Sequence, residues 1–107
     1  MTPRLDPVIH APTRLSIMAL LAGVTEAEFS TVRDSVGVSD SVLSKQASAL
    51  EAACYVKIRK GYVGKRPRTW LSLTPSGREA FDAHVAALQH IVAKAGATLT
   101  PTTLRQS

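Results

Sequence analysis

The sequence predicts one small domain that is mainly α-helical and carries a single small β-hairpin. Three observations predict this fold class. The chain has 107 residues, enough for one hydrophobic core. Apolar residues recur at helical spacing along most of it, while two short segments after residue 54 alternate and are rich in β-branched and aromatic residues. No apolar run approaches the roughly 18 residues that a membrane span needs.

The first predicted helix begins at Pro12 and ends at Gly23. Proline suits the first turn of a helix, because the N–H that it lacks would have no partner there. The segment between them, "TRLSIMALLA", is apolar on almost every side. We therefore expect this helix to be central in the fold or shared between two subunits.

A second helix is predicted after Thr25, which forms a capping-box pattern with Glu28. An apolar stripe follows at Phe29, Val32 and Val36. Gly37 should end this helix and Ser39 should cap the next one. Only "GVS" then separates the two helices, and so tight a turn predicts a helix-turn-helix.

The third helix is predicted to bury one face and expose the other. Its apolar residues recur at spacings of four, three and four, at Leu43, Ala47, Leu50 and Cys54. The opposite face is short-chained and polar, and it consists of Ser41, Lys45 and Ser48, flanked by Val42, Ser44 and Ala49. Gln46 lies nearer to the edge of the core.

The segments "YVKIR" and "TWLSL" predict two strands joined by a loop that contains Gly61, Gly64 and Pro67. Thr74 and Pro75 have the residue types of a helix cap and a first helical position. A last helix of about 21 residues should run to about Ala95. Its apolar stripe is Phe81, Val85, Leu88 and Val92. This order predicts a winged helix-turn-helix over residues 1–97 and a flexible tail over residues 98–107.

Positive charge is concentrated around the predicted hairpin. The chain has 13 basic and 8 acidic residues, a net charge of +5. Seven of the basic residues lie between Ala52 and Arg78, where there is no Asp or Glu. Because charge of this density without acidic neighbours repels itself, the segment predicts an anionic partner.

Three segments resemble a known family: "LDPVIHAPTRLSIMALLAG", "VSDSVLSKQASALEAACYV" and "GKRPRTWLSLTPSGREAF". From about Leu5 to about Ile91, the chain resembles the short, stand-alone MarR/ArsR-like winged-helix transcriptional regulators. The resemblance implies a dimeric bacterial or archaeal repressor or activator. Cys54 departs from it, because the family usually has glycine there. If the position needs a left-handed backbone, cysteine implies strain.

The third helix and the hairpin together predict an interface for double-stranded DNA. A helix fits the major groove, where each base pair offers a different pattern of donors and acceptors. The hairpin should hold its cations out beyond the body of the domain, on phosphates or in the minor groove. The predicted DNA-binding residues are Ser39, Ser41, Val42, Ser44, Lys45, Ser48, Lys60, Lys65, Arg66 and Arg68.

Two alternatives to this interface stay open from the sequence. A winged helix can instead bind RNA or an acidic protein partner through the same basic hairpin, since the fold alone does not determine the partner. The outer face of the third helix and the hairpin can also be ordinary solvated surface, and the stems of Lys57 and Arg59 can simply cover the outside of the sheet.

Catalysis and metal binding have little support in the sequence. Cys54 falls on the predicted core side of its helix and is interpreted as a buried thiol, the alternative being a thiol through which an oxidant controls DNA binding. His84 and His90 are not at a metal-binding spacing on their helix and are interpreted as surface or dimer-contact histidines. His10 should cap or pack locally. We therefore predict a protein that is not an enzyme and has no metal and no cofactor.

A homodimer is also predicted, because the end of the last helix, with Ile91 and Val92, extends past any core of its own. A small-molecule effector, if there is one, should bind between the DNA-binding body and the dimer helices, and the sequence does not indicate its identity. The N-terminus carries no export signal, which predicts a cytoplasmic protein without a membrane partner.

Overall fold

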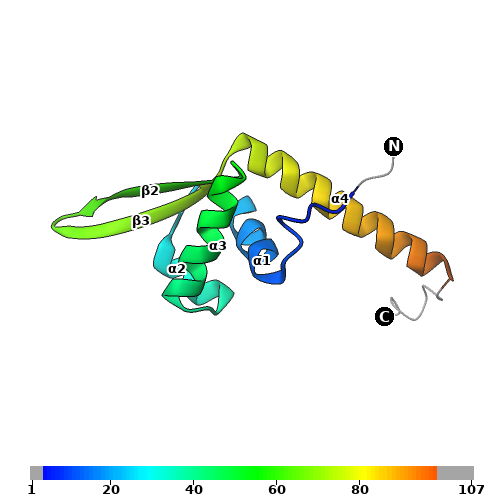
Figure 1. Ribbon diagram of the computed structural model, residues 1–107, viewed down its shortest axis with the longest axis horizontal. Helices are drawn as coiled ribbons and strands as arrows, with labels where there is room; N and C mark the ends of the chain where they lie inside the picture. Colours follow the sequence, from blue (N-terminus) through cyan, green and yellow to red (C-terminus); the bar gives the residue numbers. More distant parts are fainter. Residues whose placement is uncertain (1–3, 99–107) are drawn as a thin grey trace.

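The computed structural model describes residues 4–98 and contains in this range four helices and a three-stranded sheet (Figure 1). In chain order the elements are α1 (Pro12–Ala22), β1 (Ala27–Glu28), α2 (Phe29–Val36), α3 (Asp40–Ala52), β2 (Val56–Val63), β3 (Arg66–Leu73) and α4 (Pro75–Thr98). The strands pair antiparallel in the order β1-β3-β2. The predicted winged helix-turn-helix is confirmed. Apart from Thr98, the predicted tail lies outside the described residues.

The first helix, α1, is central, as its apolar composition predicts. It packs against α2, α3, α4 and β3, and its Ile17, Met18 and Leu21 are fully buried. The other buried members of this core are Ile9, Val32, Leu43, Ala47, Leu50, Val56 and Leu71. Burial of one such large apolar side chain stabilises the fold by about 2 kcal/mol. The buried face predicted for the third helix is thus confirmed from Leu43 to Leu50.

The predicted tight turn joins α2 to α3. Gly37 has φ 78°, in the left-handed region that glycine adopts without strain, and its N–H donates to the carbonyl of Arg33 at 2.8 Å. Ser39 Oγ accepts from the N–H of Val42 and caps α3. The guanidinium of Arg33 also pairs with Asp40 at 2.8 Å across the turn. These bonds fix the direction of α3 relative to α2.

The capping box predicted at Thr25 and Glu28 is wrong. Ala27 and Glu28 form β1, which pairs with β3, and α2 begins only at Phe29. Glu28 occupies the N-cap position with an extended backbone, but its side chain makes no capping hydrogen bond. Since strand pairing holds this backbone in place, the carboxylate of Glu28 is left to bond elsewhere, to Arg68.

A long hairpin formed by β2, β3 and their turn, here called the wing, extends away from the helices (Figure 1). The two strands pair along their whole length, so the turn contains only Gly64 and Lys65. Gly64 has φ 64°, as two-residue hairpin turns often require. The predicted extent of the loop is wrong, because Gly61 and Pro67 lie within the paired strands.

The chain turns sharply between α3 and the wing. Cys54 has φ 66°, in the left-handed region, and its thiol is free and exposed. Its predicted place on the buried face is wrong, because α3 ends at Ala52 and the backbone turns before Cys54 is reached. A left-handed backbone costs a residue other than glycine roughly 1–2 kcal/mol, so the strain considered from the sequence is present.

The cap predicted for the last helix is confirmed, and it also joins α4 to the end of α3. Thr74 Oγ1 accepts from the N–H of Gly77 at 2.8 Å and donates to the carbonyl of Cys54 at 2.7 Å. The N–H of Thr74 donates to the carbonyl of Tyr55 at 3.0 Å. Gly77 packs so closely on this carbonyl that an added Cβ would lie 2.0 Å from its oxygen.

The last helix, α4, is longer than predicted, and its second half leaves the body of the domain (Figure 1). It runs to Thr98, past the predicted end near Ala95. The helix buries His84 and Ala87, whereas Ile91 and Val92 further along are 48% and 67% exposed. The apolar end of this helix is therefore open to solvent.

Gly77→Ala should lower the free energy of unfolding by about 3 kcal/mol, because the added methyl group overlaps the carbonyl of Tyr55. Chemical denaturation followed by circular dichroism measures this change. Gly96→Ala in the same helix is the control: its methyl group meets nothing within 4 Å, so this variant should gain up to about 1 kcal/mol. Equal stabilities of the two variants would contradict the close contact at Gly77.

Candidate nucleic-acid interface

The outer face of α3 is exposed, as the sequence predicts. Its exposed residues are Ser41, Val42, Ser44, Lys45 and Ser48. Ser39 is exposed too, but its hydroxyl caps α3 and lies 3.3 Å from the hydroxyl of Ser41. Gln46 belongs to the body, since its side chain accepts from Arg14 at 2.9 Å. Short side chains let the backbone of such a helix approach a partner closely.

A groove of about 630 Å³ lies between α3 and the wing. Phe29, Ala47, Ile58 and Leu71 give it an apolar floor. Its polar lining consists of Ser44, Ser48 and Glu51 on α3 and Lys60 and Thr69 on the wing. The fold thus brings predicted residues from two separate segments, the helix and the hairpin, to one surface.

The tip of the wing carries both cations and exposed apolar side chains. Lys65 lies in the turn and Arg66 begins β3, and both are exposed. Tyr62 and Val63 are 72% and 54% exposed. Neither was predicted as a site residue, although their occurrence within a cationic segment was a visible signal. Exposed apolar groups beside cations indicate a contact surface.

Two arginines of the wing are paired with glutamates from the segment before α2. Arg59 donates to both carboxylate oxygens of Glu26 at 2.8 and 2.9 Å, and Arg68 donates to Glu28 at 3.0 Å. The hydrogen bond from Arg59 lowers the pKa of Glu26, and the pKa of Arg59 is raised by the same bond. Arg59 also lies over Trp70, with Cζ 4.0 Å from the ring centroid. This side chain therefore covers the sheet, as one of the alternatives from the sequence allowed.

These pairs correct two predictions. The basic segment has acidic partners after all, which were hidden because Glu26 and Glu28 precede their arginines by 33 and 40 positions. Arg68 is not held out beyond the body of the domain, because its guanidinium lies against Glu28.

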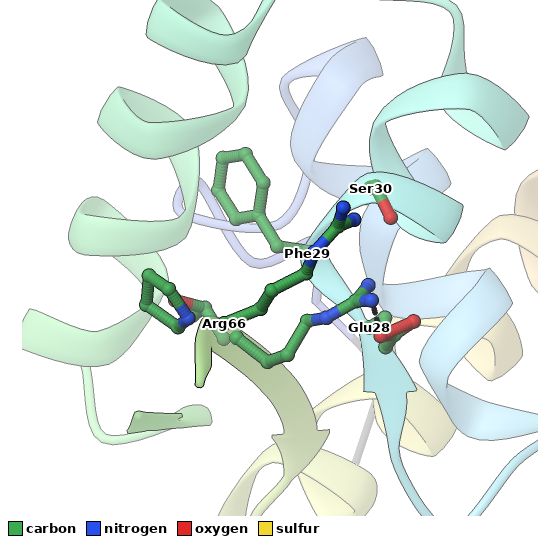
Figure 2. A pocket seen from close by; sticks show the side chains of 7 residues that line it. Glu28, Phe29, Ser30 and Arg66 are labelled. Carbon is green, nitrogen blue, oxygen red and sulfur yellow. Dashed lines mark hydrogen bonds and ion pairs between the residues drawn. The ribbon is translucent and has the colours of Figure 1, made fainter. Parts of the chain in front are cut away.

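A second hollow, of about 460 Å³, lies where the wing meets the start of α2 (Figure 2). Glu28, Phe29 and Ser30 line it from β1 and α2, and residues 66–69 line it from β3. The dashed line in Figure 2 marks the pair of Glu28 with Arg68. Arg66 reaches over the same hollow and forms no ion pair within residues 4–98.

Several cations of the wing have no carboxylate partner. In the part of the chain that the structure describes, Lys57, Lys60, Lys65 and Arg66 form no ion pair. Arg78 donates to the carbonyl of Ala22 at 3.0 Å and so stabilises the end of α1. The surface available to an anion is therefore smaller than the run of seven basic residues predicts.

His84 is fully buried, so its interpretation as a surface histidine is wrong. Its Nδ1 accepts from the N–H of Asp6 at 2.9 Å, and its Nε2 lies 3.4 Å from Nδ1 of His10. His10 thus packs locally, as predicted. Asp6 in turn accepts from the hydroxyl of Tyr55 at 2.5 Å. Burial, aided by His10, lowers the pKa of His84, which keeps the ring neutral and joins the segment before α1 to α4.

The remaining candidates for chemistry do not converge. Cys54 and His90 are exposed on different elements. Within residues 4–98, no three His, Cys, Asp or Glu side chains are grouped so that they can hold a metal ion. None of the helices in this range is both long and apolar enough to span a membrane.

A family model described as a winged helix DNA-binding domain matches residues 13–92, which include α1, the helix-turn-helix, the wing and most of α4. The chain belongs to this winged-helix DNA-binding family. An uncharacterized protein of Methanocaldococcus jannaschii is 27% identical over 78 residues, which are 73% of this chain and 85% of that protein.

Solved structures of regulators share the winged-helix fold. A transcriptional regulator homologue from Pyrococcus horikoshii OT3 is 26% identical, with a TM-score of 0.76 over 81% of this chain and 86% of that one. A regulator of the MarR family from Enterococcus faecalis V583 is 24% identical, with a TM-score of 0.70 over 86% of this chain and 84% of that one. The chain thus belongs to a DNA-binding family and has the fold of transcriptional regulators, and the predicted likeness to MarR regulators is confirmed at the level of the fold.

The stability of this winged-helix protein should fall as the pH drops below about 6.5, the ordinary pKa of histidine, towards the lower folded-state pKa of His84. Between these two values the unfolded chain binds the proton and the folded chain does not, so acid favours unfolding. Thermal melting across this pH range measures the effect. His84→Gln should remove this part of the pH dependence.

His90→Gln is the matched control, because His90 is exposed on the same helix. It should keep the pH dependence of the wild type. If the two substitutions flatten the profile equally, the buried ring of His84 is not its origin.

Proposed function

We propose that the protein is a sequence-specific regulator of transcription that places α3 in the major groove of duplex DNA and the wing on the backbone or in the minor groove. The observation that carries the proposal is the groove that α3 and the wing line together. Polar side chains of the helix and Lys60 of the wing lie on this one surface, so both can meet the same duplex. The exposed cations of the tip, Lys65 and Arg66, continue it.

In this proposal the outer face of α3 gives the protein its sequence specificity. Ser41, Ser44 and Ser48 can donate to or accept from base edges, and Lys45 can reach the acceptors of guanine. Val42 is 40% exposed and suits the methyl group of thymine. Ser39 uses its hydroxyl for the cap, and we place it at the phosphate backbone beside the start of the helix.

The wing supplies affinity. Lys60, Lys65 and Arg66 form no ion pair within residues 4–98, so a phosphate can approach them without competing with a carboxylate. Each phosphate contact releases condensed counterions, which makes binding depend on salt. Arg68 was predicted as a fourth contact, but its guanidinium is already bonded to Glu28.

We also propose that two copies associate through α4. The second half of this helix projects from the domain and exposes Ile91 and Val92 (Figure 1). An exposed apolar helix end of this kind favours association, and a second copy supplies a matching surface. A two-fold dimer would present two α3 helices to half-sites about one helical turn apart.

Arg66→Ala should weaken binding to specific and scrambled duplexes about equally and reduce the slope of log affinity against log salt by about 0.9, the value of one lost phosphate contact. Ser41→Ala should instead cost on the order of 1–3 kcal/mol on the specific duplex and spare the scrambled one. Fluorescence anisotropy at several salt concentrations measures both, on a duplex that the wild type selects from genomic DNA.

Arg4→Ala is the control for lost charge, since Arg4 is exposed in the segment before α1. It should keep the salt slope of the wild type. An unchanged slope for Arg66→Ala would mean that the wing is not on the DNA backbone, and an RNA or acidic protein partner would then replace duplex DNA in the proposal.

Val92→Asp should convert the dimer to a monomer and weaken operator binding by at least tenfold, because the two half-sites are then bound independently. Light scattering at micromolar concentration gives the mass. Val24→Asp is the control, as Val24 is 41% exposed but follows α1 and is not part of α4, and it should stay dimeric. A monomeric wild type would contradict the dimer.

A further inference from the structure

Two acidic residues stand beside the wing, where simple electrostatics opposes DNA binding. Glu26 and Glu28 carry negative charge close to the cations that meet phosphates in the proposed function. Carboxylates at such a place repel the DNA backbone and lower affinity. Both, however, are bonded to arginines of the wing, one on β2 and one on β3.

The pair of Glu26 with Arg59 has a built geometry. The guanidinium makes two hydrogen bonds to the carboxylate and lies over the ring of Trp70, its neighbour across the hairpin. A Cβ at Gly61 would lie 3.2 Å from the indole, so glycine at this position leaves the ring its room. A planar guanidinium suits bidentate bonding together with stacking, which lysine cannot reproduce.

The pair of Glu28 with Arg68 lies nearer to the tip of the wing, since Arg68 is two residues closer to the turn than Trp70. Glu28 is opposite Trp70 in the pairing of β1 with β3, and its carboxylate reaches forward to Arg68. Both side chains are about one third exposed, so the pair is partly shielded from solvent.

Apart from these pairs, β1 grips the wing weakly. The strand has two residues, and its ladder with β3 ends at Trp70, so the distal half of the wing has no third strand beside it. Through their ion pairs, the two glutamates connect the body of the domain to both strands of the hairpin. Glu28 is also the N-cap residue of α2, so its ion pair with Arg68 links the wing directly to the helix-turn-helix.

We propose that Glu26 and Glu28 are positioning residues for DNA binding. They hold the wing through Arg59 and Arg68 at the angle at which the wing tip and α3 meet one duplex. In the complex the two arginines stay paired with these carboxylates and do not bind phosphates. This inference rests on the proposed function and adds to it the residues that set the direction of the wing.

Glu28→Gln and Glu26→Gln test the proposal, because the lost charge and the lost position of the wing predict opposite changes in affinity for the selected duplex. Loss of a carboxylate by itself tightens binding to any duplex. Loss of the wing's direction should weaken the duplex selected from genomic DNA by about tenfold and leave a scrambled duplex as tightly bound or tighter. Glu51→Gln is the matched control: Glu51 lines the groove on α3 without an ion pair in residues 4–98, and its loss should tighten both duplexes. If Glu28→Gln behaves like Glu51→Gln, the proposal is wrong.

An exchange of the charges of Glu28 and Arg68 tests whether Arg68 positions the wing or binds a phosphate. Glu28→Arg and Arg68→Glu should each weaken the selected duplex, whereas the double variant restores the pair with an unchanged net charge. It should recover to within about threefold of the wild type and keep the wild-type salt slope. A double variant as weak as Arg68→Glu alone would place Arg68 on the DNA and overturn the proposal. Thermal melts establish that each variant is folded.

The fluorescence of Trp70 reports on the pair of Glu26 with Arg59 in the absence of DNA. Trp70 is the single tryptophan of the chain, and Arg59 covers its ring. Glu26→Gln should raise the quenching of its fluorescence by acrylamide, and Glu51→Gln should not. Unchanged quenching in Glu26→Gln would mean that Glu26 does not hold Arg59 over Trp70, and the proposal would be wrong. A wild type that binds neither duplex would refute the proposed function, and this measurement keeps the two failures apart.

Discussion

Tyr55 joins four parts of the molecule, and the geometry of the interface depends on this junction. Its N–H donates to the carbonyl of Leu50 near the end of α3, and its carbonyl accepts from Thr74 at the start of α4. Gly77 packs on that carbonyl, and the hydroxyl of Tyr55 bonds to Asp6 in the N-terminal segment. The wing begins at the next residue. The helix proposed to read DNA, the wing and α4 therefore leave one point in directions that main-chain contacts fix.

The basic residues of the wing divide into two groups by their surroundings. Arg59 and Arg68 are bonded to carboxylates, so their planar guanidinium groups serve the structure. Lys57, Lys60, Lys65 and Arg66 are exposed and form no ion pair within residues 4–98, so no carboxylate competes with an anion for them. A net charge read from the sequence counts both groups alike. Only the second group adds freely to the attraction of a polyanion.

Local signals in the sequence predicted most of the fold. Helical spacing located the buried face of α3, and Gly37 and Ser39 predicted the turn before it, because caps and turns depend on neighbouring residues. The outer face of α3 followed from helix geometry alone. These features need no knowledge of distant parts of the chain.

Several of the failures involve partners that are remote in sequence. Glu28 fits a capping box locally, but pairing with β3 takes it into a strand. His84 is a polar residue on a helix, and only the N–H of Asp6 makes its burial acceptable. Cys54 continues the apolar spacing of α3, yet its exposure follows from the turn that the bonds of Tyr55 impose on the backbone. That same turn leaves the single thiol of the chain open to reagents at the boundary between α3 and the wing. A maleimide dye or a nitroxide label would consequently attach at one defined point beside the proposed interface, with no cysteine to remove or introduce.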